Sequence, residues 1–243
     1  MRPSTESLIK MRANRLWAVV AAAGVGQRMG GDAPKQYHTI AGRMVIDWSV
    51  AALLALRELT GLMLVHAPGD KRWQAADWAT LASVHGCEGG RTRADSVLCG
   101  LRALRALGAD DADSVLVHDA ARPGVKLSDI RRLIEQVDGN PDGGLLAIPV
   151  RDTLKRAHAT DCVSETLPRE QLWQAMTPQL FPLGRLEQAL SACAGAAITD
   201  ESLAMERIGA KPRLIMGAPE NIKYTYPADQ AWLSFTLGKR EQE

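Results

Sequence analysis

Short apolar runs alternate with segments of helical spacing along almost the whole chain. A short continuous apolar run is typical of a strand buried on both faces of a sheet. Such runs lie at 17–22, 62–65, near 84, at 115–117 and at 144–150. Apolar residues recur every three or four positions, as they do in helices, at 43–58, 70–82, 93–107 and 127–137. This alternation predicts an α/β fold with a parallel sheet and helices on both faces.

The stretch 151–171 interrupts the alternation. Its two short runs, Thr153–Ala157 and Cys162–Leu167, flank a polar turn and hold too few apolar residues for a pair of core strands. We therefore predict a projecting β-hairpin arm at about 151–171. Because an isolated hairpin is only marginally stable in water, the arm is expected to pack against another subunit.

The remaining segments complete one domain. Beyond the arm, the pattern predicts helices near 183–194, near 200–208 and from about 227, with a strand at 213–216. No linker composition or internal repeat marks a second unit, so residues 16–243 are predicted to form a single domain. Residues 1–15 mix charged and scattered apolar positions, and we expect a flexible N-terminal extension there.

Composition and charge exclude several classes of protein. Of the 243 residues, 46% are hydrophobic and 23% are charged, which predicts a packed globular domain. The 29 Lys and Arg residues nearly balance the 28 Asp and Glu residues, so nucleic acid and membrane surfaces are not expected partners. No apolar run reaches the roughly 18 residues of a membrane span, and the N-terminus lacks a secretory signal. We expect a cytoplasmic protein.

The first predicted strand leads into a glycine-rich loop at 22–35, AAGVGQRMGGDAPK. A Walker loop would need Lys and then Ser or Thr directly after the last glycine, and a dinucleotide fingerprint would need glycine where Met29 stands. Neither pattern fits. The glycines let backbone N–H groups approach phosphate oxygens, and Arg28 and Lys35 add two cations, which suits a triphosphate. The alternative is a tight strand–helix turn with solvated cations.

Asp119 follows the apolar run 115–117 almost directly. A carboxylate at the carboxyl end of a strand is well placed to hold Mg²⁺, which takes few protein oxygens and completes its shell with water and phosphate. The alternative is a helix or turn cap. No nucleophile is visibly paired with His118, so we expect this histidine to be structural and see no catalytic triad.

A second pair of glycines, Gly89 and Gly90, precedes the predicted helix 93–107. Such a turn allows close backbone approach and places Ser96 where it could contact a base or a ribose. The alternative is an ordinary helix start, with Thr92 as the cap and Asp95 as its capping-box partner. Taken singly, the other polar candidates are surface residues or caps: Thr153, Arg169, Thr177, Thr199 and Lys223.

Seven segments, taken together and in this order, resemble the 2-C-methyl-D-erythritol 4-phosphate cytidylyltransferase family of the non-mevalonate isoprenoid pathway. They are AAAGVGQRMGGDAPKQY, GGRTRADSVLCGL, VLVHDAARP, IPVRDTLKR, LWQAMTPQLF, ITDESLAME and NIKYTYPAD. The resemblance spans about residues 16–235. It implies a nucleotidyltransferase fold with a Rossmann-like, mostly parallel sheet, and a homodimer joined by the hairpin arms. The implied reaction is the transfer of CMP from CTP to 2-C-methyl-D-erythritol 4-phosphate, giving 4-diphosphocytidyl-2-C-methyl-D-erythritol and pyrophosphate.

The resemblance also implies a role for each matching residue. Arg28 and Lys35 match transition-state stabilisers, and Arg169 and Lys223 match residues that orient the methylerythritol phosphate. Asp119 matches the contact to CTP and to a divalent metal, for which we expect Mg²⁺. Thr153 and Arg169 would reach the site of the partner subunit. The other residues implied in substrate binding are Ala22, Ala23, Gly24, Gly90, Ser96, Arg122, Thr177 and Thr199.

The implied reaction needs no general base, because a phosphate monoester with a second pKa of about 6 is largely dianionic at neutral pH. Catalysis then rests on positioning and on neutralising charge during an in-line displacement.

One departure from the family pattern is Arg91, which stands where the family often has an acidic residue. Three other functions compete with the implied one: a cytidylyltransferase for ribitol 5-phosphate, a nicotinamide-dependent oxidoreductase, and a non-catalytic protein with the same fold. The broken glycine fingerprint disfavours the second, and the joint presence of the charged candidates disfavours the third.

Overall fold

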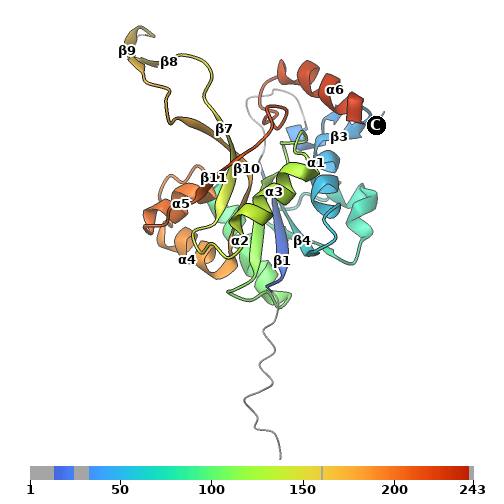
Figure 1. Cartoon of the computed structure of the whole chain (residues 1–243). Coiled ribbons are helices and arrows are strands. Elements are labelled where there is room, and N and C mark those ends of the chain that lie inside the picture. The colour runs from blue at the N-terminus through green and yellow to red at the C-terminus, as the bar shows by residue number, and fades with distance from the viewer. Residues whose placement is uncertain (1–13, 25–32, 160, 241–243) are drawn as a thin grey trace, which may run out of the picture.

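A seven-stranded sheet forms the centre of the computed structural model, which describes residues 14–24, 33–159 and 161–240. The strand order is β11-β7-β10-β6-β1-β4-β5 (Figure 1). In chain order these strands are β1 (Leu16–Ala22), β4 (Leu59–His66), β5 (Val84–Glu88), β6 (Ser114–Asp119), β7 (Gly144–Pro149), β10 (Trp173–Pro182) and β11 (Arg213–Met216). Only β10 runs antiparallel to its neighbours within this sheet. The expected mostly parallel sheet is confirmed.

Both faces of the sheet are covered by helices, because the central strands are apolar on both sides. In β1, Ala18 and Val20 belong to a cluster with α1 (Val45–Leu54) and α3 (Leu127–Val137). Trp17 and Val19 belong to a second cluster. That cluster takes in α2 (Arg93–Ala106), α4 (Leu183–Ala192) and α5 (Glu201–Arg207). Successive side chains of a strand point to opposite faces, which explains why an uninterrupted apolar run feeds two cores.

A third and smaller cluster anchors the end of the chain. Helix α6 (Asp229–Arg240) buries Leu233 and Leu237 against Trp48 of α1 and Tyr224. A two-stranded ribbon, β2 (Thr39–Ile40) and β3 (Arg43–Met44), adds Ile40 to the same cluster. Figure 1 shows α6 beside α1 and β3, at the same end of the molecule as the loops that follow the parallel strands.

The predicted hairpin arm is present. Strands β8 (Leu154–Ala157) and β9 (Val163–Leu167) pair antiparallel and project away from the sheet (Figure 1). Their residues are exposed along nearly their whole length. The packing of this arm against a second subunit stays a prediction.

The prediction of a helix at 70–82 is wrong. Two short 3₁₀ turns, η4 (Arg72–Ala75) and η5 (Asp77–Thr80), stand there instead, separated by an extended Ala76. Trp73 and Trp78 stack with ring centroids 6.4 Å apart. Residues five apart do not share a face of an α-helix, so the break between the two turns is what brings the two rings together.

The other predicted elements are confirmed with small shifts of their ends. The helix expected at 43–58 begins two residues later and ends at Leu54, and its first two positions belong to β3. None of the described helices is both long and apolar enough to cross a membrane. The expected N-terminal extension lies almost wholly outside the described residues.

Candidate active site

The loop after β1 is fixed by Gln36, a buried residue of the 3₁₀ helix η3 (Lys35–Tyr37). The side-chain amide of Gln36 donates hydrogen bonds to the carbonyls of Ala22 (2.7 Å) and Gly24 (3.1 Å). These two hydrogen bonds fix the backbone conformation from Ala22 to Gly24. Lys35 precedes Gln36 directly, and both residues line the same cavity as Ala22, Ala23 and Gly24.

The start of α2 forms the opposite wall of this cavity. Thr92 and Asp95 make both bonds of a capping box: the Thr92 hydroxyl accepts from the Asp95 amide, and the Asp95 carboxylate accepts from the Thr92 amide. Ser96 accepts from the Gly90 amide at 3.1 Å. A Cβ on Gly90 would lie 2.4 Å from the Cβ of Asp95, so this glycine is required by the close packing of the loop on the helix.

Asp119 stands at the end of β6, where three cations surround its buried carboxylate. Its Oδ1 lies 2.9 Å from Nε of Arg93, and its Oδ2 lies 2.9 Å from Nζ of Lys223 and 3.5 Å from Nε of Arg122. Burial alone would raise the pKa of Asp119, but the charges of Arg93, Lys223 and Arg122 outweigh burial and hold that pKa well below its usual range. The carboxylate is therefore ionised throughout the physiological range.

Arg93 is itself held by a second buried carboxylate. Glu201, at the start of α5, is fully buried, and its two carboxylate oxygens accept from Nη1 (2.6 Å) and Nη2 (3.1 Å) of Arg93. Burial by itself would lower the pKa of Arg93, but Asp119 and Glu201 raise it, so the guanidinium stays charged. Glu201 therefore positions Arg93, and Arg93 in turn positions the carboxylate of Asp119.

His118 is a buried structural residue. Thr177 accepts a hydrogen bond from the Asp119 amide at 3.0 Å, so its hydroxyl proton is free to point to Nδ1 of His118, also at 3.0 Å. Nε2 of His118 then carries the proton and faces the Arg122 carbonyl at 3.2 Å. Burial lowers the pKa of His118 to about 4, so the ring is neutral at physiological pH.

Two cavities meet at Asp119. The larger has a volume of about 750 Å³ and is bordered by the β1 loop, the start of α2 and Asp119. The smaller, about 200 Å³, is bordered by Arg122, Thr177, Gln179, Thr199 and Asp200. Arg93, Asp119 and Lys223 line both. The arrangement offers a large compartment and a small one that share a charged wall, which suits the meeting of a nucleotide and a smaller polar substrate.

Comparison with known proteins identifies the same family that the sequence segments resemble. The IspD family model, described as 2-C-methyl-D-erythritol 4-phosphate cytidylyltransferase, matches residues 16–239. A protein of that name from Ectopseudomonas mendocina (strain ymp) is 47% identical over 231 residues, which cover 94% of this chain and 98% of that protein. A namesake from Xanthomonas axonopodis pv. citri (strain 306) is 49% identical, with coverage of 93% and 85%.

The chain belongs to the 2-C-methyl-D-erythritol 4-phosphate cytidylyltransferase family. Solved structures agree. One described as 4-diphosphocytidyl-2C-methyl-D-erythritol synthase has a TM-score of 0.81 and 36% identity, and covers 93% of this chain and 100% of that chain. The 2-C-methyl-D-erythritol 4-phosphate cytidylyltransferase of Francisella tularensis has a TM-score of 0.79 and 29% identity, with coverage of 92% and 100%.

This member of the cytidylyltransferase family gathers most of the predicted site residues. The large cavity is lined by Ala22, Ala23, Gly24, Lys35, Gly90, Ser96, Asp119 and Lys223, and the small cavity by Arg122, Thr177 and Thr199 together with Asp119 and Lys223. Thr153 and Arg169 lie exposed at the base of the arm and line neither cavity of this single chain. Arg28 lies outside the described residues. Their roles in catalysis and binding stay predictions.

Sequence reasoning missed four residues that build this cytidylyltransferase site. Gln36 and Arg93 line the large cavity, Gln179 lines the small one, and Glu201 holds Arg93 from outside both. Gln179 binds Asp200 and the Ser202 amide, which fixes the start of α5. The only signal was position: Arg93 and Glu201 each begin a helix, and each lies inside one of the seven segments that carry the family resemblance.

A divalent metal fits this site in one specific way. The described residues contain no group of three or more His, Cys, Asp or Glu side chains placed to hold a metal ion. Asp119 is one ionised carboxylate, and both of its oxygens already contact cations. Each carboxylate oxygen has two lone-pair directions, so Asp119 can still offer one ligand. The residues fit a Mg²⁺ ion that brings most of its ligands as water and phosphate.

Proposed function

We propose that this chain transfers the cytidylyl group of CTP to 2-C-methyl-D-erythritol 4-phosphate, releasing pyrophosphate and forming 4-diphosphocytidyl-2-C-methyl-D-erythritol. The reaction is a step of the non-mevalonate route to isoprenoid precursors. Family membership supports this function over transfer to ribitol 5-phosphate, since the curated relatives are named for the methylerythritol substrate.

One structural observation carries the proposal: the ionised carboxylate of Asp119 lies between three cations, at the boundary of a large and a small cavity. Two polyanionic substrates repel each other, so an enzyme that joins them needs fixed positive charge at the meeting point. Lys223 and Arg93 supply that charge from the shared wall. Asp119 keeps these cations in place while no substrate is bound.

The chemical step follows from these charges. An oxygen of the methylerythritol phosphate dianion attacks the α-phosphorus of CTP, the bond from that phosphorus to the bridging oxygen of the β-phosphate breaks, and pyrophosphate leaves with the electron pair. No proton has to be removed from the nucleophile. Lys35 lines the large cavity beside the β1 loop, and its role in the proposal is to neutralise the triphosphate. Arg28 has the same role in the proposal.

Magnesium is part of the proposal. Asp119 is the protein ligand, and the nucleotide phosphates and water complete the shell. When bound, the ion supplies charge neutralisation of the phosphates. Removal of the divalent ion is therefore expected to weaken CTP binding.

The active enzyme is proposed to be a homodimer. Thr153 and Arg169, at the base of the arm, line neither cavity of their own chain, and the two strands of the arm are largely exposed. In the dimer these two residues reach the small cavity of the partner subunit and bind the methylerythritol phosphate. We further propose that the enzyme works in the cytoplasm, where CTP is available.

The test is a substrate panel. Purified protein with Mg²⁺ is given methylerythritol phosphate and each of the four ribonucleoside triphosphates, and pyrophosphate release and the product mass are measured. We expect turnover with CTP and a product of the mass of the cytidine diphosphate derivative. The same panel with ribitol 5-phosphate is expected to give little pyrophosphate. Equal rates with both alcohol phosphates, or no release with any triphosphate, would refute the proposal.

A further inference from the structure

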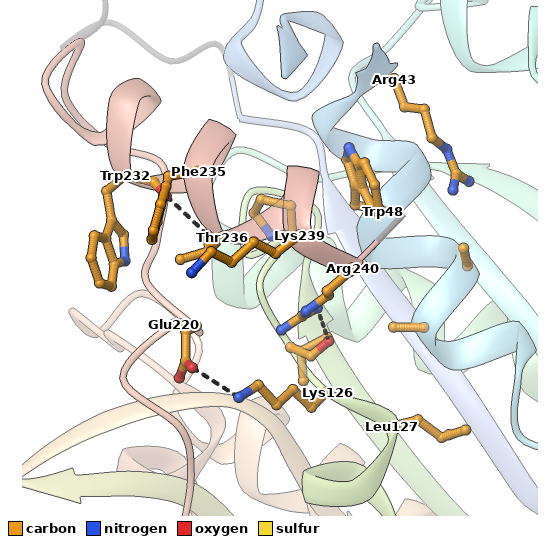
Figure 2. Close-up of a pocket in the computed structure, with 14 residues that line it drawn as sticks. Arg43, Trp48, Lys126, Leu127, Glu220, Trp232, Phe235, Thr236, Lys239 and Arg240 are labelled. Carbon is orange, nitrogen blue, oxygen red and sulfur yellow. Dashed lines mark hydrogen bonds and ion pairs between the residues drawn. The ribbon is translucent and has the colours of Figure 1, made fainter. Parts of the chain in front are cut away.

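A separate cavity of about 690 Å³ lies between α6, α1 and the segment that leads into α3 (Figure 2). Small-molecule sites in proteins commonly have volumes of about 300–1,000 Å³. None of the residues that line this cavity lines either of the two cavities at Asp119. We call it the α6 cavity. It is independent of the proposed catalytic site in its lining, and its size suits a small ligand.

Aromatic rings form much of the wall of the α6 cavity. Trp232 and Phe235 come from α6, lie with ring centroids 6.3 Å apart, and are 47% and 57% exposed. Trp48 of α1 lines the cavity from the opposite side and is held in place by a hydrogen bond from its indole N–H to the Ile40 carbonyl. Two neighbouring large rings left half-exposed in a cavity mark a binding surface more often than isolated surface residues do.

Positive charge dominates the polar groups of the α6 cavity. Four cationic side chains line it, against one carboxylate: Arg43, Lys126, Lys239, Arg240 and Glu220. Glu220 pairs with Lys126 at 2.8 Å. Among the described residues, no carboxylate lies within 4.0 Å of Arg43 or Lys239. A ligand that enters this cavity therefore meets a field that favours negative charge.

Two of these cations are already positioned by aromatic rings. The Arg43 guanidinium carbon lies 4.7 Å from the ring centroid of Trp48, and the Lys239 ammonium lies 4.2 Å from that of Phe235. Such contacts are attractive and reduce the freedom of both long side chains. Binding an anion then costs less side-chain entropy than it would on an ordinary surface lysine.

We propose that the α6 cavity binds a small soluble anion that carries a flat aromatic group. The ring of the ligand packs on Trp232 and Phe235, and its acidic group faces Lys239. Arg43, on the far side of Trp48 in Figure 2, adds positive charge to the cavity from a greater distance. The volume of the cavity and the mixture of aromatic and cationic side chains specify this class. The site does not depend on the proposed catalytic function, because the two share no lining residue.

The test compares two fluorescent probes that share one ring system. 1-Anilinonaphthalene-8-sulfonate carries a sulfonate, and N-phenyl-1-naphthylamine is its uncharged counterpart. Both are titrated into the full chain with excess CTP and Mg²⁺ present, and equilibrium dialysis gives the stoichiometry. We expect saturable binding of one sulfonate probe per chain, insensitive to CTP, and at least about tenfold tighter than binding of the uncharged probe, since charge-assisted contacts are the strong ones.

Variants locate the site. The double variant Arg43→Gln with Lys239→Gln should weaken the sulfonate probe at least about tenfold and leave the uncharged probe unchanged. Phe235→Ser should weaken both probes. Arg131→Gln removes an exposed cation of α3 that does not line the cavity, and it should change neither. All four side chains are at least partly exposed, so the variants are expected to fold, which thermal unfolding checks.

Four outcomes would overturn the proposal. The first is no saturable binding of the sulfonate probe, and the second is its displacement by CTP, which would place it at the catalytic cavities. The third is an unchanged affinity in the double variant. The fourth is a fall in probe binding as the protein associates beyond the arm-mediated dimer, which sedimentation at several protein concentrations measures; the occupant of the cavity is then a second copy of the chain. A failed substrate panel would leave all these outcomes readable.

Discussion

The buried ion pair between Glu201 and Arg93 allows a direct test of whether Glu201 positions Arg93 and, through it, Asp119. We consider the substitution Glu201→Gln, which keeps the size of the side chain and removes its charge. Glu201 is fully buried and binds the guanidinium through both oxygens, while the Arg93 side chain is only 24% exposed. The variant leaves a largely buried guanidinium with one carboxylate, Asp119, in place of two.

Removing one partner from a buried ion pair destabilises proteins by about 3–5 kcal/mol, because the remaining charge stays desolvated. Arg93 keeps Asp119 and some contact with solvent, so we expect the lower end, about 3 kcal/mol. Urea unfolding followed by circular dichroism measures the change. The matched control is Arg102→Gln, which breaks the more exposed pair of Arg102 with Glu187 at 3.7 Å and should cost less than about 1 kcal/mol.

The activity of the same variant separates positioning from stability. With Glu201→Gln folded at low temperature, the less constrained Arg93 no longer fixes Asp119, so kcat should fall at least about tenfold. Glu201→Asp, which restores the charge at a shorter reach, should recover part of that loss. A stability change below about 1 kcal/mol together with an unchanged kcat would show that Glu201 neither holds Arg93 nor orders the site, and would refute the reasoning.

Three further predictions test other parts of the molecule. Lys35→Ala should lower kcat by about 100-fold or more in pyrophosphate-release assays, as expected for the loss of a preorganised cation, whereas the exposed Lys211→Ala should leave kcat unchanged. The depressed pKa of His118, about 4 against 6.5 in the unfolded chain, gives stability that is fully present above pH 6.5 and is lost as the pH falls toward 4. Urea titrations at pH 7.5 and 4.5 should therefore show that the wild type loses about 2–3 kcal/mol more than His118→Gln over this interval, and equal losses would contradict the assignment. Mixing inactive Lys35→Ala and Arg169→Ala subunits should restore activity if the arm completes the partner's site, and confirmed exchange without recovery would place the site within one chain.

Local patterns predicted the fold well, because the main elements are specified by nearby residues. The apolar run at 17–22 is buried from both sides of the sheet, so its uninterrupted pattern marks a central strand and its end marks the loop that lines the cavity. The capping box of Thr92 and Asp95 needs residues only three apart, and both of its bonds form. The same turn is a helix cap and also lines the large cavity, and the contact of Ser96 with a base or a ribose stays a prediction.

The failure at 70–82 has a physical cause that local spacing does not carry. Trp73 also stacks on His66, with centroids 5.6 Å apart, and Asp70 binds the backbone and the guanidinium of Arg72. These contacts fix two short turns against β4 and β5, and the packing of two indole rings outweighs the helical preference of the intervening residues. Propensity is a weak prior wherever tertiary packing decides.

The candidate site was only half predictable, for a related reason. Lys35 and Asp119 each stand in a segment whose residue types already suggest phosphate chemistry, so each could be proposed from its own segment, whereas Lys223 became a candidate only through the family resemblance. Arg93 and Glu201 are 108 positions apart, and each one alone resembles an ordinary residue in the first turn of a helix. What makes them part of the site is that α2 and α5 begin at the same edge of the sheet, so that a buried carboxylate faces a guanidinium. That meeting is a property of the topology, and a single sequence contains no local pattern that pairs the two helix starts.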